Sequence, residues 1–261
     1  MRLSGSGSLW RGFLSDIVTV SAGKVLGGAA AVLTTILMSR WLGPVDFGLF
    51  STCISLQLLL AGAAGDALDT GTVRFVASYR QSDPGRAAMT LSLALMLKLA
   101  IGGVLVLAAV LVAPRLAALL FHDQGSAWLV LAVAGGALGL LLFRSALAYL
   151  QAYQSFGTYV LLEGAHSLGR LLAVVGLALI GVLTARTGFL AVAMLPIALL
   201  PATFLLVRNA FPWARRVDWA ILRSFLRYSG WAMMSVVAVS IHSRLDVLML
   251  GWMRGPAAAG I

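Results

Sequence analysis

The sequence is poor in charged residues and contains a single cysteine. Charged side chains make up 11% of the 261 residues, whereas a soluble domain keeps about a quarter of its residues charged. The single cysteine, Cys53, excludes an intramolecular disulfide and any cysteine-based metal cluster. We interpret Cys53 as a small packing residue within an apolar stretch. The low charge argues against an ordinary soluble domain.

Sequence motifs of common enzymes are also lacking. The chain has no glycine-rich phosphate-binding loop ending in Lys-Ser/Thr, so we do not expect it to hydrolyse ATP. It has no HExxH, no G-x-S-x-G and no Cys/His cluster. A membrane glycosyltransferase or polymerase would carry a larger extramembrane loop with grouped acidic residues, and the connections here are short. We therefore expect no enzymatic activity, no cofactor and no metal site.

Apolar side chains, in contrast, make up 61% of the chain and form long uninterrupted runs. Backbone groups in hydrocarbon must be hydrogen-bonded internally, which leaves α-helices or closed β-barrels. Runs such as residues 91–113 lack the two-residue alternation of barrel strands. We therefore predict an all-α, polytopic transmembrane helical bundle of about seven spans. The predicted spans are residues 17–38, 47–68, 89–113, 127–150, 159–184, 189–207 and 228–252.

The net charge of +10 is located in the connections between these spans. Because positive residues accumulate in cytoplasmic loops, the arginines predict a multi-pass protein of the cell inner (plasma) membrane with a cytoplasmic N-terminus. No polar domain presents a basic face, so we expect contacts with membrane lipids and not with nucleic acid. The more basic side carries Arg2, Arg11, Arg74, Arg80, Arg86 and the arginines of residues 208–227, against Arg40, Arg115, Arg186 and Arg254 on the other.

The order of apolar and basic segments predicts three parts. Residues 1–207 form an N-terminal six-helix transmembrane lobe, and residues 208–227 form a basic, amphipathic linker at the cytoplasmic surface. Residues 228–261 supply the first helix of an incomplete C-terminal lobe. This pattern is typical of a two-bundle protein cut short, so we expect the chain to be a fragment.

Four stretches carry a family resemblance by their order and spacing. Residues 40–48 contain an Arg-x-Leu-Gly-Pro-x-x-Phe-Gly pattern between the first two spans, and residues 66–77 end the second span. Residues 148–156 connect the fourth and fifth spans, residues 246–251 lie in the seventh span, and residues 260–261 lie in the turn after it. Together they resemble the oligosaccharide flippase (polysaccharide biosynthesis protein) family of the multidrug/oligosaccharidyl-lipid/polysaccharide exporter superfamily.

The resemblance implies a fold of two six-helix lobes, often with two further helices. It also implies a function, which is the translocation of polyprenyl-pyrophosphate-linked oligosaccharide to the outer leaflet by alternating access, for surface polysaccharide synthesis. A polysaccharide polymerase or glycosyltransferases would then be partners. The missing second lobe departs from the family pattern and bears on whether this polypeptide transports alone.

Ionisable residues inside the spans are the candidate functional residues, because each costs roughly 2.5–3.5 kcal/mol at mid-helix. We predict a cationic cavity that binds the pyrophosphate of the substrate through ammonium and guanidinium groups. Two further residues, His242 and Asp246, lie one turn apart and are candidates for ion coupling. The predicted cationic residues are Lys24, Lys98, Arg144, Arg170 and Arg244.

Each candidate also has a structural explanation. Lys24 and Arg144 can extend to the inner interface, and Arg144 can form an ion pair with Glu163. His242 and Asp246 can make an interhelical contact instead of binding an ion.

Lys98 lies mid-span without an obvious acidic partner nearby in the sequence, which favours the cavity for it. For Asp66 and Asp69 we expect an interfacial pairing with Arg74. On the fifth span, Glu163, His166 and Arg170 share one helical face, because they are three and four residues apart.

Two other functions remain open from the sequence. A drug or cation antiporter on the same architecture would need acidic residues in its cavity, whereas the chain places Lys24 and Lys98 in its spans. A membrane scaffold that assists a polysaccharide assembly complex without transporting is the second alternative.

Overall fold

All the regular structure in the described part of the chain is helical. The structure is a computed structural model and describes residues 6–121, 124–207, 218–242 and 245–254. In chain order the elements are α1 (Ser6–Tyr79), α2 (Pro84–Phe121), the short 3-10 helix η1 (Gln124–Ser126), α3 (Ala127–Ala152), α4 (Phe156–Leu179), α5 (Ala185–Val207), α6 (Trp219–His242) and α7 (Leu245–Arg254).

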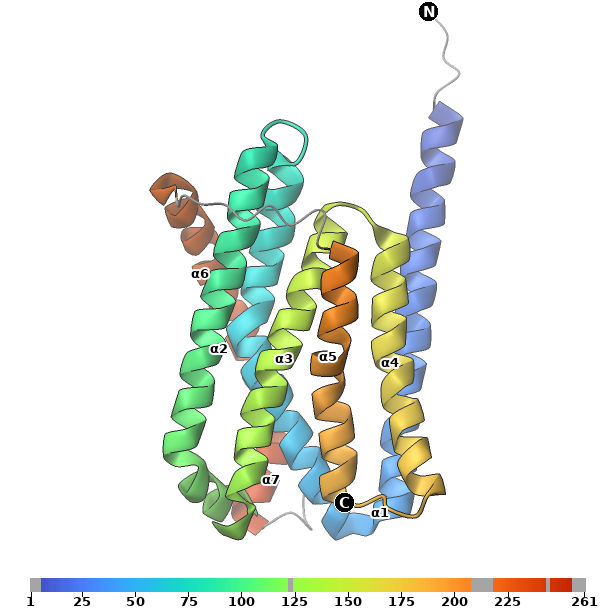
Figure 1. Cartoon of the computed structure of the whole chain (residues 1–261), viewed down its shortest axis with the longest axis vertical. Helices are drawn as coiled ribbons and strands as arrows, with labels where there is room; N and C mark the ends of the chain where they lie inside the picture. The colour runs from blue at the N-terminus through green and yellow to red at the C-terminus, as the bar shows by residue number, and fades with distance from the viewer. Residues whose placement is uncertain (1–5, 122–123, 208–217, 243–244, 255–261) are drawn as a thin grey trace, which may run out of the picture.

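Helix α1 contains two of the predicted spans because the chain folds back at Gly43. The backbone angles of Gly43, φ 73 and ψ 174, lie in a region that essentially only glycine occupies. Pro44 follows and has no N–H to donate to a helical hydrogen bond. The first arm (residues 6–42) and the second arm (residues 44–79) therefore lie in one bent element (Figure 1). The connection between the first two predicted spans is thus a sharp bend.

Helices α2 to α5 run alternately down and up beside α1, and α7 continues in the direction of α6 (Figure 1). At one end, the turn at 80–83 joins α1 to α2, and the Asp83 carboxylate accepts a hydrogen bond from the backbone N–H of Arg86 at 3.1 Å. The Arg80 guanidinium donates to the carbonyl oxygen of Ala152 at 3.0 Å. That bond links this turn to the end of α3, so the ends of three helices are held together there.

Helices α1 to α5 have the length and composition of membrane spans. Each contains a window apolar enough to cross a membrane. The candidate span within α1, Val20–Tyr79, has 60 residues, about 90 Å of helix, for a hydrocarbon core of about 30 Å. Large apolar side chains face outward: Leu111 of α2 and Leu179 of α4 are 74% and 82% exposed. The predicted all-α transmembrane bundle is confirmed.

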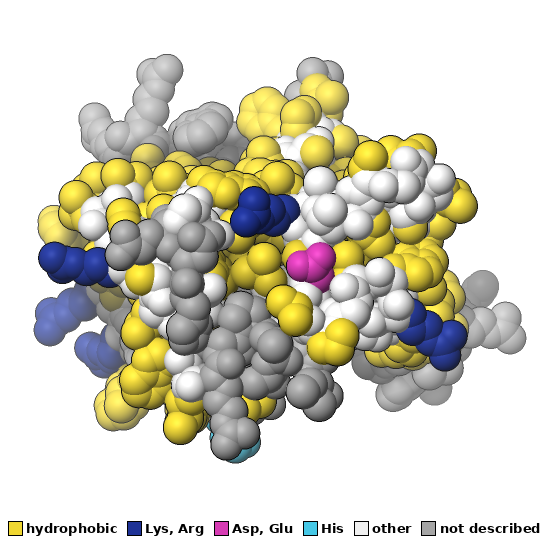
Figure 2. Space-filling model, turned by 90° about the horizontal axis from the view of Figure 1, so that it is seen from below, with side chains coloured by type: hydrophobic (Ala, Val, Ile, Leu, Met, Phe, Trp, Pro, Cys, Tyr) yellow, Lys and Arg dark blue, Asp and Glu magenta, His cyan; other side chains and the backbone are white. Residues whose placement is uncertain are grey.

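Helix α3 lies in the middle of the bundle. It packs against the second arm of α1 on one side and against α2 and α5 on others. Its buried residues belong to two apolar clusters, one around Leu129 and Val133 and one around Leu141 and Phe143. Seen from the end that carries the Gly43 bend, the surface is mainly hydrophobic with scattered charged side chains (Figure 2).

The last described helices differ in their limits from the sequence prediction. Helix α6 begins at Trp219, so residues 219–227, which we placed in the linker, are helical. The predicted seventh span, residues 228–252, is described as two helices, because α6 ends at His242 and α7 begins at Leu245. Phe225 of α6 is fully buried against α1 and α2. The division into two lobes stays a prediction.

Candidate functional site

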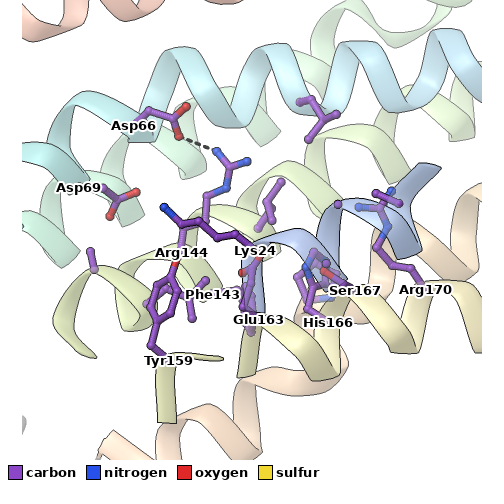
Figure 3. Close-up of a pocket in the computed structure, with 18 of the residues that line it drawn as sticks. Lys24, Asp66, Asp69, Phe143, Arg144, Tyr159, Glu163, His166, Ser167 and Arg170 are labelled. Carbon is purple, nitrogen blue, oxygen red and sulfur yellow. Dashed lines mark hydrogen bonds and ion pairs between the residues drawn. The ribbon is translucent and has the colours of Figure 1, made fainter. Parts of the chain in front are cut away.

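A cavity of about 720 Å³ lies between the two arms of α1 and helices α3, α4 and α5. It exists because the first arm packs on α4 and the second arm on α3, while α3 and α4 contact each other little. Figure 3 shows labelled side chains of α1, α3 and α4 around this cavity. Its polar lining residues are Lys24, Gln57, Asp66, Asp69, Arg144, Gln151, Tyr159, Glu163, His166, Ser167 and Arg170.

Two glycines of the first arm shape this cavity, one by allowing close helix packing and one by leaving open space. A side chain on Gly23 would approach Val160 of α4 to 2.7 Å, so the absence of one allows the two helices to meet closely. Gly28 lines the cavity, and a Cβ atom there would meet nothing within 4 Å. The close contact and the open space therefore lie on neighbouring turns of the same arm.

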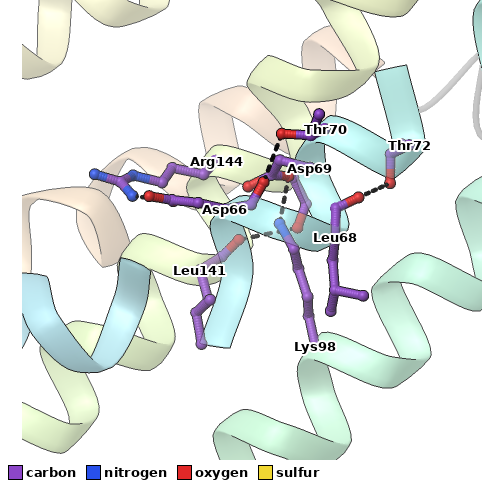
Figure 4. A network of polar contacts seen from close by, with 9 residues as sticks. Asp66, Leu68, Asp69, Thr70, Thr72, Lys98, Leu141 and Arg144 are labelled. Carbon is purple, nitrogen blue, oxygen red and sulfur yellow. Dashed lines mark hydrogen bonds and ion pairs between the residues drawn. The ribbon is translucent and has the colours of Figure 1, made fainter. Parts of the chain in front are cut away.

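One ion pair inside the cavity joins the second arm of α1 to α3. Nη1 of Arg144 lies 2.5 Å from Oδ1 of Asp66 (Figures 3 and 4). The Arg144 and Asp66 side chains are 31% and 43% exposed, so this pair faces the cavity and not the apolar core. It can therefore exchange its partners with a bound polar group.

A second ion pair, one helical turn further along, is more deeply buried. The Lys98 ammonium group of α2 donates to the Asp69 carboxylate of the second arm (Figure 4). Lys98 is only 1% exposed, whereas Asp69 is 19% exposed and lines the cavity. Lys98 thus lies behind the cavity wall and neutralises a carboxylate that faces it.

These pairs correct three predictions from the sequence. Asp66 and Asp69 do not pair with Arg74, which stacks instead on the ring of Tyr228 at 4.4 Å. Lys98, which we predicted in the cavity, does not line it and pairs instead with Asp69 of a neighbouring helix.

The third correction concerns Arg144, whose ion pair in the structure is with Asp66 and not with Glu163. The signal that we missed was the spacing of Asp66 and Asp69. Two carboxylates three residues apart inside an apolar span share a face and need cationic partners there.

The three residues that share a face of α4 all line the cavity, as their spacing predicts. Glu163, His166 and Arg170 come from successive turns, and the His166 ring lies 5.1 Å from that of Phe143 of α3. Lys24 of the first arm lines the same cavity. With Arg144, the lining holds three cationic and three acidic side chains. The predicted cationic cavity is therefore charge-balanced.

Two buried polar atoms of the lining have no hydrogen-bond partner among the described residues. They are Oε1 of Gln57, whose side chain is 4% exposed, and Nε of Arg170. A buried acceptor or donor without a partner costs about 1–3 kcal/mol, so a polar occupant of the cavity would satisfy both. Gln57 was not predicted from the sequence, because an uncharged amide within an apolar span does not by itself indicate a functional site.

Of the remaining predicted residues, only His242 has a described side chain, and it does not line the cavity. His242 lies at the end of α6 with an exposed side chain. Arg244 and the side chain of Asp246 lie outside the described residues, so their predicted roles stay predictions.

A comparison with protein families decides which family this bundle represents. The sequence profile of the family described as polysaccharide biosynthesis protein matches residues 13–261. The chain belongs to the polysaccharide biosynthesis protein family. No curated protein and no solved structure gave a match.

Membership of the polysaccharide biosynthesis protein family agrees with the helical bundle and assigns the chain to polysaccharide synthesis or export. Five described helices with the length and composition of spans make this family member a membrane protein. Its cavity lies among these helices, where charged groups are costly. The concentration of such groups around one space marks it as the candidate site of the family's function.

Proposed function

We propose that this protein translocates polyprenyl-pyrophosphate-linked oligosaccharide across the cytoplasmic membrane by alternating access. The observation that supports the proposal is a polar cavity of about 720 Å³ inside the apolar bundle of a polysaccharide biosynthesis family member. A lipid-linked glycan has a polar head that cannot cross hydrocarbon and a lipid tail that can remain in it. The cavity receives the head while the tail stays in the bilayer.

The mixed lining suits a head that carries both hydroxyl groups and phosphates. Carboxylate and amide oxygens, as on Asp66 and Gln57, accept hydrogen bonds from sugar hydroxyls. Lys24, Arg144 and Arg170 offer donors to sugar oxygens and to the pyrophosphate. A transport site must also release its substrate. Cations whose charge is partly neutralised by neighbouring carboxylates bind an anion less tightly than free cations, which permits release.

Charge at the ends of the helices supports a cytoplasmic N-terminus in the inner membrane. Arg74, Arg80 and Arg86 belong to the end of α1, the following turn and the start of α2. The opposite end has a mainly hydrophobic surface with scattered Lys and Arg side chains (Figure 2). In this orientation glycosyltransferases supply the substrate on the cytoplasmic side, and a polymerase consumes it on the other.

The acidic residues of the cavity favour one alternative, a drug or cation antiporter. Three carboxylates, Asp66, Asp69 and Glu163, line the cavity, which the sequence analysis did not anticipate. Two of them are already paired with Arg144 and Lys98. A cationic substrate would have to compete with these internal partners, so we rank the antiporter second.

The experiment is a flipping assay in proteoliposomes with fluorescent polyprenyl-pyrophosphate-linked oligosaccharide. We expect the wild-type protein to expose the label to a membrane-impermeant quencher faster than empty liposomes do. A Cβ atom on Gly28 meets nothing within 4 Å, so Gly28→Leu places its side chain in the cavity. We expect flipping to fall by about tenfold or more, while folding is retained.

The matched control is Gly103→Leu on α2. Gly103 is exposed on the bundle surface, and a Cβ atom there also meets nothing within 4 Å. We expect normal flipping from this variant. Flipping by Gly28→Leu at the wild-type rate would contradict the proposed site. Wild-type protein that moves a cationic dye but not the glycan would favour the antiporter, and movement of neither would favour a non-transporting partner of an assembly complex.

A further inference from the structure

A second polar space lies on the other side of the second arm of α1, where this arm meets α6. It is a groove of about 540 Å³ lined by Arg74 and Phe75 of α1 and by Ser224, Arg227, Tyr228, Trp231 and Ala232 of α6. None of these residues lines the larger cavity between α1, α3 and α4. The groove is therefore a site separate from the one assigned above.

Aromatic packing between the two helices holds the groove in shape. The Phe75 ring makes edge contacts with Phe225 at 6.0 Å and with Tyr228 at 5.9 Å between ring centroids. The Arg74 guanidinium lies over the Tyr228 ring at 4.4 Å. Stacking of this kind fixes the plane of a guanidinium but leaves its N–H donors available at the edge. Arg74 is therefore positioned to bind an anion.

The groove combines charge with apolar surface. The side chains of Arg74, Arg227 and Ser224 are exposed, and no ion pair joins either arginine to an acidic group among the described residues. Trp231, one turn further along α6, is 73% exposed. Tryptophan and tyrosine are enriched where a membrane meets water, beside lipid headgroups. Further toward the C-terminal end of α6, the outer surface of the helix is apolar, and Met234 and Val239 are exposed.

We propose that this groove binds the phosphate headgroup of an anionic phospholipid, which fixes α6 against the second arm of α1. Two guanidinium groups and the Ser224 hydroxyl supply the phosphate ligands, as in basic pockets between transmembrane helices. The aromatic rings cover the glycerol region, and the apolar surface that includes Met234 and Val239 contacts the acyl chains. A free phosphate ion would use the arginines but not this apolar surface, so the site belongs to a lipid.

The experiment is a lipid titration of the purified chain in neutral detergent. Phosphatidylglycerol with brominated acyl chains is added, and the quenching of tryptophan fluorescence is followed. We expect it to bind more tightly than brominated phosphatidylcholine, and inorganic phosphate at equal concentration should not compete. Because each arginine near the membrane surface strengthens binding of anionic lipid roughly fivefold, Arg74→Gln combined with Arg227→Gln should weaken it about 25-fold.

Two control variants distinguish binding in the groove from general electrostatic attraction of anionic lipid to the protein. Arg86→Gln removes an arginine near the same end of the bundle that pairs with Asp83 outside the groove, and it should leave lipid affinity unchanged. Trp231→Phe should reduce the extent of quenching without changing affinity.

Equal affinity for the two lipids, competition by phosphate, or equal weakening by Arg86→Gln would overturn the proposal. If the double glutamine variant does not fold, the Trp231→Phe result decides, because unchanged quenching would show that the lipid lies elsewhere. None of these results tests flipping through the larger cavity, which is a separate proposal.

Discussion

Four ionisable side chains in the membrane-spanning helices form two ion pairs between helices that are distant in the sequence. Lys98 and Asp69 are 29 residues apart, and Arg144 and Asp66 are 78 apart. A single charge in hydrocarbon is costly, but a pair with good geometry neutralises both members. The two pairs therefore hold α1 to α2 and α3, and they place carboxylates at the cavity wall.

Removal of Lys98 tests the structural part of this arrangement. Lys98→Met leaves Asp69 without its partner, so we expect the unfolding free energy to fall by roughly 3–5 kcal/mol. The double variant Lys98→Met with Asp69→Leu should recover most of this loss, because no unpaired charge remains. Unfolding in mixed detergent and sodium dodecyl sulfate measures both values.

The comparison for this pair is Arg86→Ala. Arg86 and Asp83 form an ion pair at 3.3 Å with side chains 55% and 47% exposed. Its loss should cost less than about 1 kcal/mol. If Lys98→Met were as mild as Arg86→Ala, the Lys98–Asp69 pair would not stabilise the bundle as described.

Substitution of Gln57 distinguishes an effect on substrate binding from an effect on stability. Its buried Oε1 atom has no partner among the described residues, so we expect Gln57→Leu to leave the unfolding free energy unchanged or to raise it by about 1 kcal/mol. Flipping should decrease, because a hydrogen-bond acceptor for the glycan is lost. Flipping rates and unfolding are measured on the same preparations.

Thr52→Val is the matched variant for Gln57→Leu. Oγ1 of Thr52 is also buried without a partner, but Thr52 does not line the cavity. Stability should respond as for Gln57→Leu, with normal flipping. A transport loss in both variants would show that the Gln57 effect does not arise from contact with substrate.

At the scale of the helices, the apolar runs predicted most of what the structure contains. Six of the seven predicted spans fall on α1 to α5, because burial in lipid imposes both length and composition on a helix. The limits of α6 and α7 were not predicted. Residues 219–227 are mixed in polarity, so their helical state depends on packing of Phe225 against α1 and α2, which no local pattern reveals.

The charge pairs were beyond sequence analysis for a related reason. Depth in the membrane could be read for Lys98, Asp66 and Asp69 from their places in the spans. The sequence does not show which helix packs against which, because the apolar faces of transmembrane helices are chemically alike. The face shared by Glu163, His166 and Arg170 was predictable, since it depends on one helix alone.

The bend of α1 depends on the backbone of a single residue. Gly43 has φ 73 and ψ 174, so Gly43→Ala should lower the unfolding free energy by roughly 1–3 kcal/mol. Gly157→Ala, within α4 and with open space around it, should be neutral or stabilising. The same unfolding assay measures both. Equal stability of the two variants would contradict the strain assigned to Gly43.

At the scale of the whole molecule, the described helices have an apolar exterior and enclose a polar cavity. The exterior fits the lipid bilayer, and the cavity between α1, α3, α4 and α5 offers cations, carboxylates and unpartnered polar atoms to a guest. Family membership ties this architecture to polysaccharide synthesis or export. The central claim is that the polar head of a lipid-linked glycan occupies this cavity.

The most direct measurement is protection of a cysteine placed in the cavity. Gly28→Cys is labelled with a water-soluble maleimide in proteoliposomes, while the native Cys53 is fully buried. Ser82→Cys, in the exposed turn between α1 and α2, serves as the reference. Lipid-linked oligosaccharide is predicted to slow labelling at position 28 and not at position 82. An unchanged labelling rate at position 28 in the presence of saturating glycan would contradict the claim.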